Sequence, residues 1–116
     1  MQMQIIDHSD DITHIKLIGS LDIGGADEID MKFQAAVASA RQHALVDMSE
    51  VDFMSSLGMR MFVECAKALK RTDHKLVLFG LDPNVKMALN HARLEQIMVL
   101  ADSQQDTMAA LATTTQ

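Results

Sequence analysis

The chain has few of the residue types that build disulfides, metal–thiolate sites or stacking platforms. Among 116 residues there is one cysteine, Cys65, and there is no tryptophan and no tyrosine. A single cysteine excludes an internal disulfide and a thiolate-rich zinc site, which suits a reducing compartment. With only four phenylalanines, the chain has little to stack on nucleic-acid bases.

Basic charge is also scarce. Ten Lys and Arg residues stand against sixteen Asp and Glu residues, so the formal net charge is -6. Phosphate backbones and anionic lipids both require a basic face. No apolar run approaches the roughly 20 residues of a membrane span, and no basic segment followed by an apolar one opens the chain. We therefore predict a cytoplasmic protein that contacts neither nucleic acid nor membrane directly.

The sequence contains no recognisable catalytic or metal-binding constellation. No Gly-x-Ser-x-Gly elbow occurs, and the five histidines are scattered, at positions assigned to ends and surfaces, without an i, i+4 pair. Catalytic triads and metal sites require converging side chains, which this spacing does not suggest. We expect no enzymatic activity, no metal and no cofactor.

The chain does contain apolar residues at regular spacing. Apolar residues make up 48% of it, and ten are methionines. The region 56–71 gives the clearest helix, because its polar residues recur at helical spacing and leave an apolar face. That face comprises Leu57, Met61, Phe62, Cys65, Ala68 and Leu69. The first helix has the same pattern at Ala26, Ile29, Phe33, Val37 and Ala40.

The whole pattern predicts a single α/β domain. Its elements are a hairpin of strands 3–8 and 12–18, a helix 26–40, a strand 44–48, a loop 49–55, a helix 56–71, a strand 75–79, a helix 83–92 with Asp82 as its cap, a strand 97–100, and a last helix from 102 to about 111. This corresponds to a mixed sheet of four to five strands with about four helices, spanning 1–116, with a weakly ordered tail at 112–116.

Two adjacent serines at a strand-to-helix junction are the most informative feature. Ser55 and Ser56 follow the predicted loop and directly precede Leu57 and Gly58. We predict Ser56 as the N-cap of the helix, a role worth about 1 kcal/mol that would by itself account for a serine there.

Three segments around these serines resemble the STAS domain of bacterial anti-sigma factor antagonists. Gly19-Ser20-Leu21-Asp22 is similar to the family's Gly-Glu-Leu-Asp, and the run 47–54 to its Asp-Leu-Ser-x-Val-x-Phe-Met. Ser55-Ser56-Leu57-Gly58-Met59-Arg60 is similar to its Asp/Ser-Ser-x-Gly-Leu-x signature. Ser55 stands where many members have Asp, and Leu57 where a small residue is usual.

The resemblance implies a protein that switches partners when it is phosphorylated. Ser56 would accept phosphate, with Ser55 as the fallback acceptor. The unmodified domain would bind an ATP-dependent anti-sigma serine kinase, and a metal-dependent phosphatase would restore the serine. We expect the partner-binding surface to comprise Asp22, Met54, Ser55, Ser56, Gly58, Met59 and Arg60.

Purely structural roles for the same residues stay open. Asp22 can be a turn-forming acid after a strand. Ser56 can be a cap in a constitutive STAS scaffold, or in a dimerisation subunit of a larger complex that is never phosphorylated. A homodimer is compatible with either function. A phosphate on Ser56 should leave the fold intact, because a helix N-terminus favours negative charge.

Overall fold

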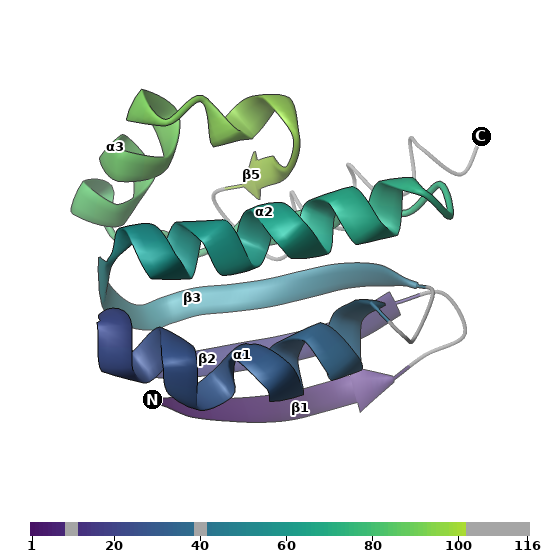
Figure 1. The fold of residues 1–116 in the computed structure, drawn as a ribbon, viewed down its shortest axis with the longest axis horizontal. Helices are drawn as coiled ribbons and strands as arrows, with labels where there is room; N and C mark the ends of the chain where they lie inside the picture. The colour runs from purple at the N-terminus through teal and green to yellow at the C-terminus, as the bar shows by residue number, and fades with distance from the viewer. Residues whose placement is uncertain (9–11, 39–41, 102–116) are drawn as a thin grey trace.

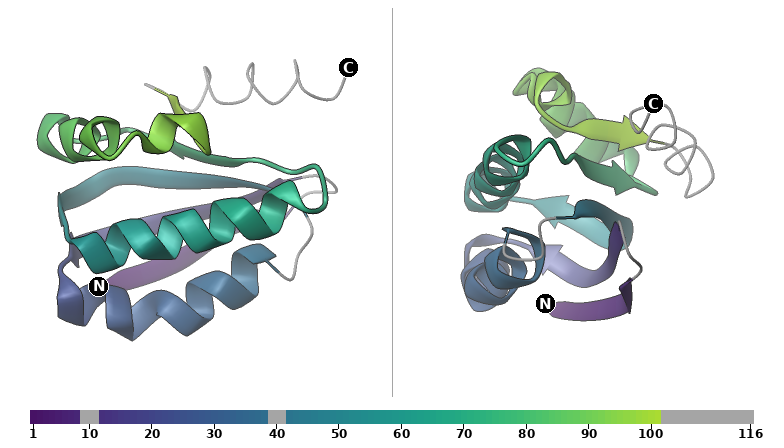
Figure 2. Two further views of the ribbon diagram at one scale, coloured as in Figure 1. Left: turned by 45° about the horizontal axis from the view of Figure 1, so that its top comes forward. Right: turned by 90° about the vertical axis from the view of Figure 1, so that its right-hand side faces the viewer.

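A five-stranded sheet carries three helices on one of its faces (Figures 1 and 2). The computed structural model describes residues 1–8, 12–38 and 42–101. The elements are β1 (Gln2–His8), β2 (Ile12–Leu21), α1 (Ile23–Ala38), β3 (His43–Met54), α2 (Ser56–Lys70), β4 (Leu76–Phe79), α3 (Pro83–His91), the short 3-10 helix η1 (Leu94–Gln96) and β5 (Val99–Ala101). The expected single mixed α/β sheet is confirmed.

The sheet order brings the ends of several strands to one edge. The strands lie in the order β1-β2-β3-β4-β5; β1 is antiparallel to β2, and the other pairs are parallel. The carboxyl ends of β2, β3 and β4 therefore share one edge of the sheet. Helices α1 and α2 lie side by side and both begin at that edge (Figure 1). Residues far apart in sequence meet there.

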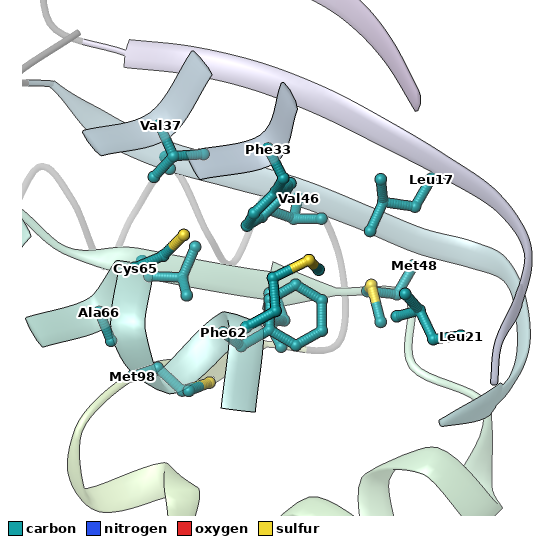
Figure 3. Packing of buried hydrophobic residues seen from close by; sticks show 14 of the residues in the cluster. Leu17, Leu21, Phe33, Val37, Val46, Met48, Phe62, Cys65, Ala66 and Met98 are labelled. Atoms are coloured by element: carbon teal, nitrogen blue, oxygen red, sulfur yellow. The ribbon is translucent and has the colours of Figure 1, made fainter. Parts of the chain in front are cut away.

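Between the sheet and the helices lies the main core, part of which is drawn in Figure 3. Phe33 of α1 meets Phe62 of α2 edge-to-face, with ring centroids 5.4 Å apart. The predicted inward residues of the first helix from Ala26 to Val37 are all buried. In α2 the prediction of buried side chains is confirmed for Met61, Phe62, Cys65 and Leu69. It is wrong for Leu57, which is exposed, and for Ala68, which is half-buried, and it missed Ala66, which is buried.

Strand β3 is longer than predicted. The segment 49–55, expected as a loop, continues the strand as far as Met54. The register of β3 against β2 shifts at two places, and at each of them β3 has one extra residue. The first shift lies between the pairs Lys16–Asp47 and Ile18–Glu50, and the second lies between Gly19–Val51 and Leu21–Met54. Bulges of this kind interrupt the alternation of buried and exposed residues. The buried residues Met48, Val51 and Met54 consequently recur at every third position. The segment therefore lacks the two-residue alternation by which a strand is predicted from sequence.

The helices also differ in detail from the prediction. Helix α1 begins three residues before Ala26, and strand β5 begins at Val99 rather than Ile97. Helix α3 starts at Pro83 with Asp82 as its cap, as predicted. Three α-helices and one 3-10 turn occur in the described residues; the predicted helix from 102 and the tail 112–116 lie outside them. Within the described part of the chain, no helix is long and apolar enough to cross a membrane.

Candidate functional site

Ser55, not Ser56, caps helix α2. The Ser55 Oγ accepts a hydrogen bond from the Gly58 N–H at 3.2 Å, and the Ser55 carbonyl accepts the first helical bond, from Met59, at 3.0 Å. Ser56 is the first residue of the helix and is exposed. The prediction of Ser56 as the N-cap is therefore wrong by one residue. Strand β3 runs six residues beyond its predicted end, to Met54, so Ser55 is the one residue between the strand and the helix and takes the position of the cap.

A short backbone bond fixes this junction to the end of β2. The Ser55 N–H donates to the Leu21 carbonyl at 2.7 Å. Gly58 packs on the same residue, since a Cβ added there would lie 3.2 Å from Leu21 Cβ. Such a contact is tighter than side chains normally make. The glycine of the Ser-Ser-Leu-Gly segment thus lets the first turn of α2 lie directly on β2.

Asp22 caps the neighbouring helix. Its Oδ1 accepts from the Gly25 N–H at 2.6 Å, and its carbonyl accepts from Ala26 at 2.9 Å, so α1 begins immediately after it. Gly25 is buried, and a Cβ on it would overlap the Ser20 carbonyl oxygen. Asp22 directly follows Leu21, the residue bonded to Ser55. The structure therefore brings Asp22 beside the serines, as predicted, and also gives it a capping role.

The exposed apolar residues at this edge are not the ones predicted. Met54, expected at the surface, is only 7% exposed, because the bulged strand turns it into the core. Gly58 is buried and Met59 half-buried. Ile23, Phe53 and Leu57 are exposed instead, at 71%, 53% and 36%. Neither Ile23 nor Phe53 lies in a periodic pattern of the sequence, because α1 begins earlier than predicted and β3 is irregular.

Arg60 lies one turn into α2 and does not touch the serines. Its Nε donates to Glu64 Oε1 at 3.2 Å, an i, i+4 ion pair that directs the guanidinium along the helix. Both side chains are largely exposed, and exposed pairs of this kind contribute little to stability.

An acidic hollow of about 410 Å³ opens at the same edge. Its lining comes from β2 (Gly19, Ser20), β3 (Ser49, Glu50, Val51, Asp52) and the segment after β4 (Gly80, Leu81, Asp82). Glu50 Oε2 pairs with Lys16 Nζ at 2.7 Å, and this hydrogen bond and charge raise the pKa of Lys16 above its ordinary value. The hollow could not be predicted from the sequence, because the ends of three strands form it and no single motif marks it.

His43 and Cys65, two chemically reactive residues away from this edge, are both buried. His43 is buried, contrary to the expected surface position, and its Nδ1 accepts from the Lys75 N–H at 3.0 Å; its ring lies edge-on to His74 at 5.1 Å. Burial, with carboxylates of Asp30 and Glu64 nearby, raises the pKa of the Cys65 thiol to about 12. Within the described residues, no three His, Cys, Asp or Glu side chains are grouped to hold a metal ion.

The mixed sheet with its helices on one face, and a serine pair at its carboxyl edge, define a small α/β domain. The profile of the STAS domain family matches residues 4–107, and the chain belongs to that family.

Individual relatives are distant in sequence and close in length. BtrV of Bordetella bronchiseptica, named as a candidate anti-sigma factor antagonist, is 27% identical over 97 residues, which is 84% of each chain. The structure of an anti-sigma factor antagonist (STAS) domain protein from Planctomyces limnophilus has a TM-score of 0.81 at 18% identity, covering 93% of this chain and 95% of that one.

One structural neighbour has been solved in two modification states. SpoIIAA from Bacillus, unphosphorylated and phosphorylated, gives TM-scores of 0.72 and 0.71 at 15% and 16% identity. The alignments cover 97% and 95% of this chain and 98% and 99% of SpoIIAA. Identities this low show the fold alone.

Proposed function

We propose that this protein is an anti-sigma factor antagonist that binds an anti-sigma serine kinase and is released when Ser56 is phosphorylated. The observation that carries the proposal is the division of roles between the two serines. Ser55 has its Oγ engaged in the cap, whereas Ser56 is exposed on the first residue of α2. The names of BtrV and SpoIIAA support the same class of function.

The chemistry asks only for an accessible hydroxyl. The Ser56 oxygen attacks the γ-phosphorus of ATP held by the kinase, the bond to the β-phosphate oxygen breaks, and ADP leaves. The hydroxyl proton passes to a base of the kinase or to water. A metal-dependent phosphatase would reverse the modification by hydrolysis, releasing inorganic phosphate. This chain is the substrate in both reactions and supplies no catalytic group.

The position of Ser56 suits a phosphate that alters binding and leaves the fold intact. At the first residue of a helix, an added negative charge meets the positive end of the helix dipole. The same phosphate adds about -1.5 to -2 charges and a bulky hydrated group beside Leu57 and close along the chain to Phe53. Burying those apolar side chains against a partner would then require desolvating the phosphate, which weakens the complex.

The test is intact mass after incubation with ATP and the anti-sigma serine kinase of the same organism. Wild type should gain the mass of one phosphoryl group, and Ser56→Ala should gain none. Ser55→Ala should still be modified, at a rate reduced by the looser cap. Modification of Ser56→Ala but not of Ser55→Ala would move the acceptor to Ser55, the fallback.

A constitutive scaffold or dimerisation subunit is the second candidate. It is favoured by strand β1, which forms one edge of the sheet and exposes Ile5 and Ile6 at 48% and 51%. Exposed apolar residues on an edge strand are a common site for pairing with another chain. Sedimentation of the purified protein distinguishes the two: a stable homodimer with no gain in mass on treatment with kinase would favour the scaffold.

A further inference from the structure

Strand β1 leaves one long edge of the sheet without a partner strand. In the described part of the chain, β1 pairs with β2 on one side only and forms the outer edge of the sheet (Figure 1). The strand at the opposite edge, β5, has three residues, whereas β1 has seven. A long edge presents a row of backbone N–H and C=O groups with which another chain can pair.

The residues of this edge lack the usual protection against such pairing. Edge strands are commonly kept short, or they carry charged side chains or proline. Positions 1–6, Met-Gln-Met-Gln-Ile-Ile, contain no charged side chain and no proline. Ile5 and Ile6 are 48% and 51% exposed. The register against β2 shifts between Ile5 and Asp7, so the regular part of the edge ends at Ile5.

We propose that a second copy of this chain pairs with β1, in an antiparallel arrangement whose two-fold axis passes through Met3. The inference goes beyond the proposed function, because it assigns a surface and an occupant that the serine switch does not involve. It gives the homodimer that either candidate function allows a defined surface and a defined register.

The side chains of β1 are sorted by type between the two faces of the sheet. Met3 and Ile5 are paired with Leu17 and Ile15 of β2, which are buried beneath the helices. Side chains directly opposite one another in a sheet lie on the same face. Met3 and Ile5 therefore face the helix-covered side, and the glutamines between and before them face the other side.

This alternation makes the strand complementary to itself. An axis at Met3 places Gln2 opposite Gln4 of the second copy, on one face of the sheet. On the other face it places Met1 opposite Ile5 of the second copy, and the two Met3 side chains meet at the axis. Apolar side chains thus oppose apolar ones and amides oppose amides, as stabilising cross-strand pairs require.

A neighbouring register is less suitable. An axis one residue further along, at Gln4, would oppose Gln2 to Ile6 and would extend the pairing across the register shift after Ile5. An amide would then face an aliphatic side chain, and the irregular end of the strand would have to pair. The pattern of side chains and the regular length of the strand favour the same axis.

A hollow beside the edge has room for the isoleucine of the second copy. It opens between β1 and α1 with a volume of about 350 Å³, and it is lined by Met1, Gln2, Met3, Glu28, Ile29 and Lys32. In the proposed register, Ile5 of the second copy lies opposite Met1 and enters this hollow. The exchange is reciprocal, so each copy fills the hollow of the other, as an isologous interface requires.

The dimer should be weak and should depend on protein concentration. The stretch 1–5 is much shorter than the roughly 20–30 residues that each partner contributes to a standard stable interface. We therefore expect a dissociation constant of about 1 µM or higher. Ser55 and Ser56 lie outside the paired stretch, so pairing and phosphorylation can be tested separately.

The first test compares the two adjacent isoleucines by sedimentation velocity, from about 1 to about 300 µM protein. Wild type should change from monomer to dimer within this range. Ile5→Lys should remain monomeric, because it would bury a charge opposite Met1. Ile6→Lys, the matched control, adds the same charge at a similarly exposed position outside the regular stretch. Its dissociation constant should stay within about threefold of that of wild type. Circular dichroism confirms that both variants are folded.

The second test determines the register by disulfide cross-linking of Gln2→Cys with Gln4→Cys. Both glutamines are exposed, and native Cys65 is buried. Opposite Cα atoms of an antiparallel pair are about 4.5–5.5 Å apart, within the reach of a disulfide. Like residues would be about 8 Å apart, which is too far. A mixture of the two variants should therefore cross-link at least about threefold faster than either variant alone.

Three results would overturn the inference. A wild-type protein that stays monomeric up to about 300 µM would refute the second copy as the occupant and leave the edge to a strand of another protein. Equal weakening of the dimer by Ile5→Lys and Ile6→Lys would refute the register, and so would cross-linking of a single variant as fast as the mixture.

These outcomes are separate from those of the proposed function. Monomeric Ile5→Lys should still gain one phosphoryl group at Ser56 on treatment with the kinase. A wild-type dimer that gains no phosphoryl group would refute the serine switch and leave the pairing of β1 in place. A phosphorylated wild type that never dimerises would refute the pairing alone.

Discussion

Two neighbouring serines hold different positions at the start of α2. Ser55 has the extended backbone of a cap, φ -89° and ψ 169°, and its hydroxyl accepts the Gly58 N–H. Ser56 is already helical and is exposed. One residue therefore carries the structural role and the other is open to modification.

This difference predicts opposite mutational profiles. Ser55→Ala should lower the free energy of unfolding by about 1 kcal/mol, because a helical N–H loses its acceptor. Ser55→Asp should restore most of that loss, since aspartate also caps well. Ser56→Ala, the control, should change stability by no more than about 0.5 kcal/mol. Urea unfolding followed by circular dichroism measures all three; a larger loss for Ser56→Ala than for Ser55→Ala would contradict the assigned cap.

The glycine pair at the start of α1 provides a second contrast at single residues. A Cβ at Gly25 would overlap the Ser20 carbonyl oxygen. A Cβ at Gly24 would lie 3.8 Å from Asp22 Oδ1, which is an ordinary contact distance. Gly25→Ala should therefore destabilise the protein by about 2 kcal/mol or more, since backbone atoms must move. Gly24→Ala should be neutral or stabilise by up to about 1 kcal/mol, because alanine favours the helix. Similar melting temperatures for the two variants would refute the close contact.

At the scale of elements, the regular parts were predictable from the sequence and the irregular part was not. Helix α2 and strand β4 follow simple periodicities, and Asp82-Pro83 marks the start of α3 through local chemistry. Strand β3 has two extra residues relative to β2, so its exposed residues no longer alternate with buried ones. Because of that irregularity, the sequence pattern predicts the cap at Ser56 instead of Ser55, and Met54 at the surface instead of in the core. Only the paired strands reveal the register, which a single segment does not encode.

The same limit applies to the site. The motif around Ser55 and Ser56 could be located from sequence, and Asp22 could be placed nearby because adjacent parallel strands end at one edge. The acidic hollow could not be predicted, since Glu50, Asp52 and Asp82 come from segments whose relative position depends on sheet order. Phe53 was hidden for the same reason as Met54.

Helix α2 should respond to charge with opposite sign at its two ends. Ser56→Asp adds one negative charge at its first residue, and Lys70→Gln removes one positive charge at its last. Both change the net charge equally, yet the helix dipole favours the first change and opposes the second. Ser56→Asp should raise the free energy of unfolding and Lys70→Gln should lower it, each by about 0.3–1 kcal/mol at low salt, as measured by urea unfolding. A large destabilisation by Ser56→Asp would mean that phosphorylation disturbs the fold.

For the whole molecule, the lack of tyrosine simplifies titration at alkaline pH. With no tyrosine and one cysteine, Cys65 is the only thiol or phenol of the chain that can ionise at alkaline pH. Cys65 has a relative exposure of 0% and its Sγ donates to Gln34 Oε1 at 3.3 Å, within the contact between α1 and α2. Ionising it would place a thiolate in the core.

The protein should consequently lose stability as the pH rises above the ordinary thiol pKa. The folded pKa of Cys65 is about 12, against 9.0 for an exposed thiol. Between these values the unfolded chain has lost the proton and the folded chain retains it, so the free energy of unfolding falls as pH rises. Relative to Cys65→Ala, wild type should lose about 1.4 kcal/mol more between pH 8 and pH 10. Urea unfolding with a reductant present measures this difference, in which the contributions common to both proteins cancel. Parallel pH profiles for the two proteins would show that the thiol is not held neutral by the fold.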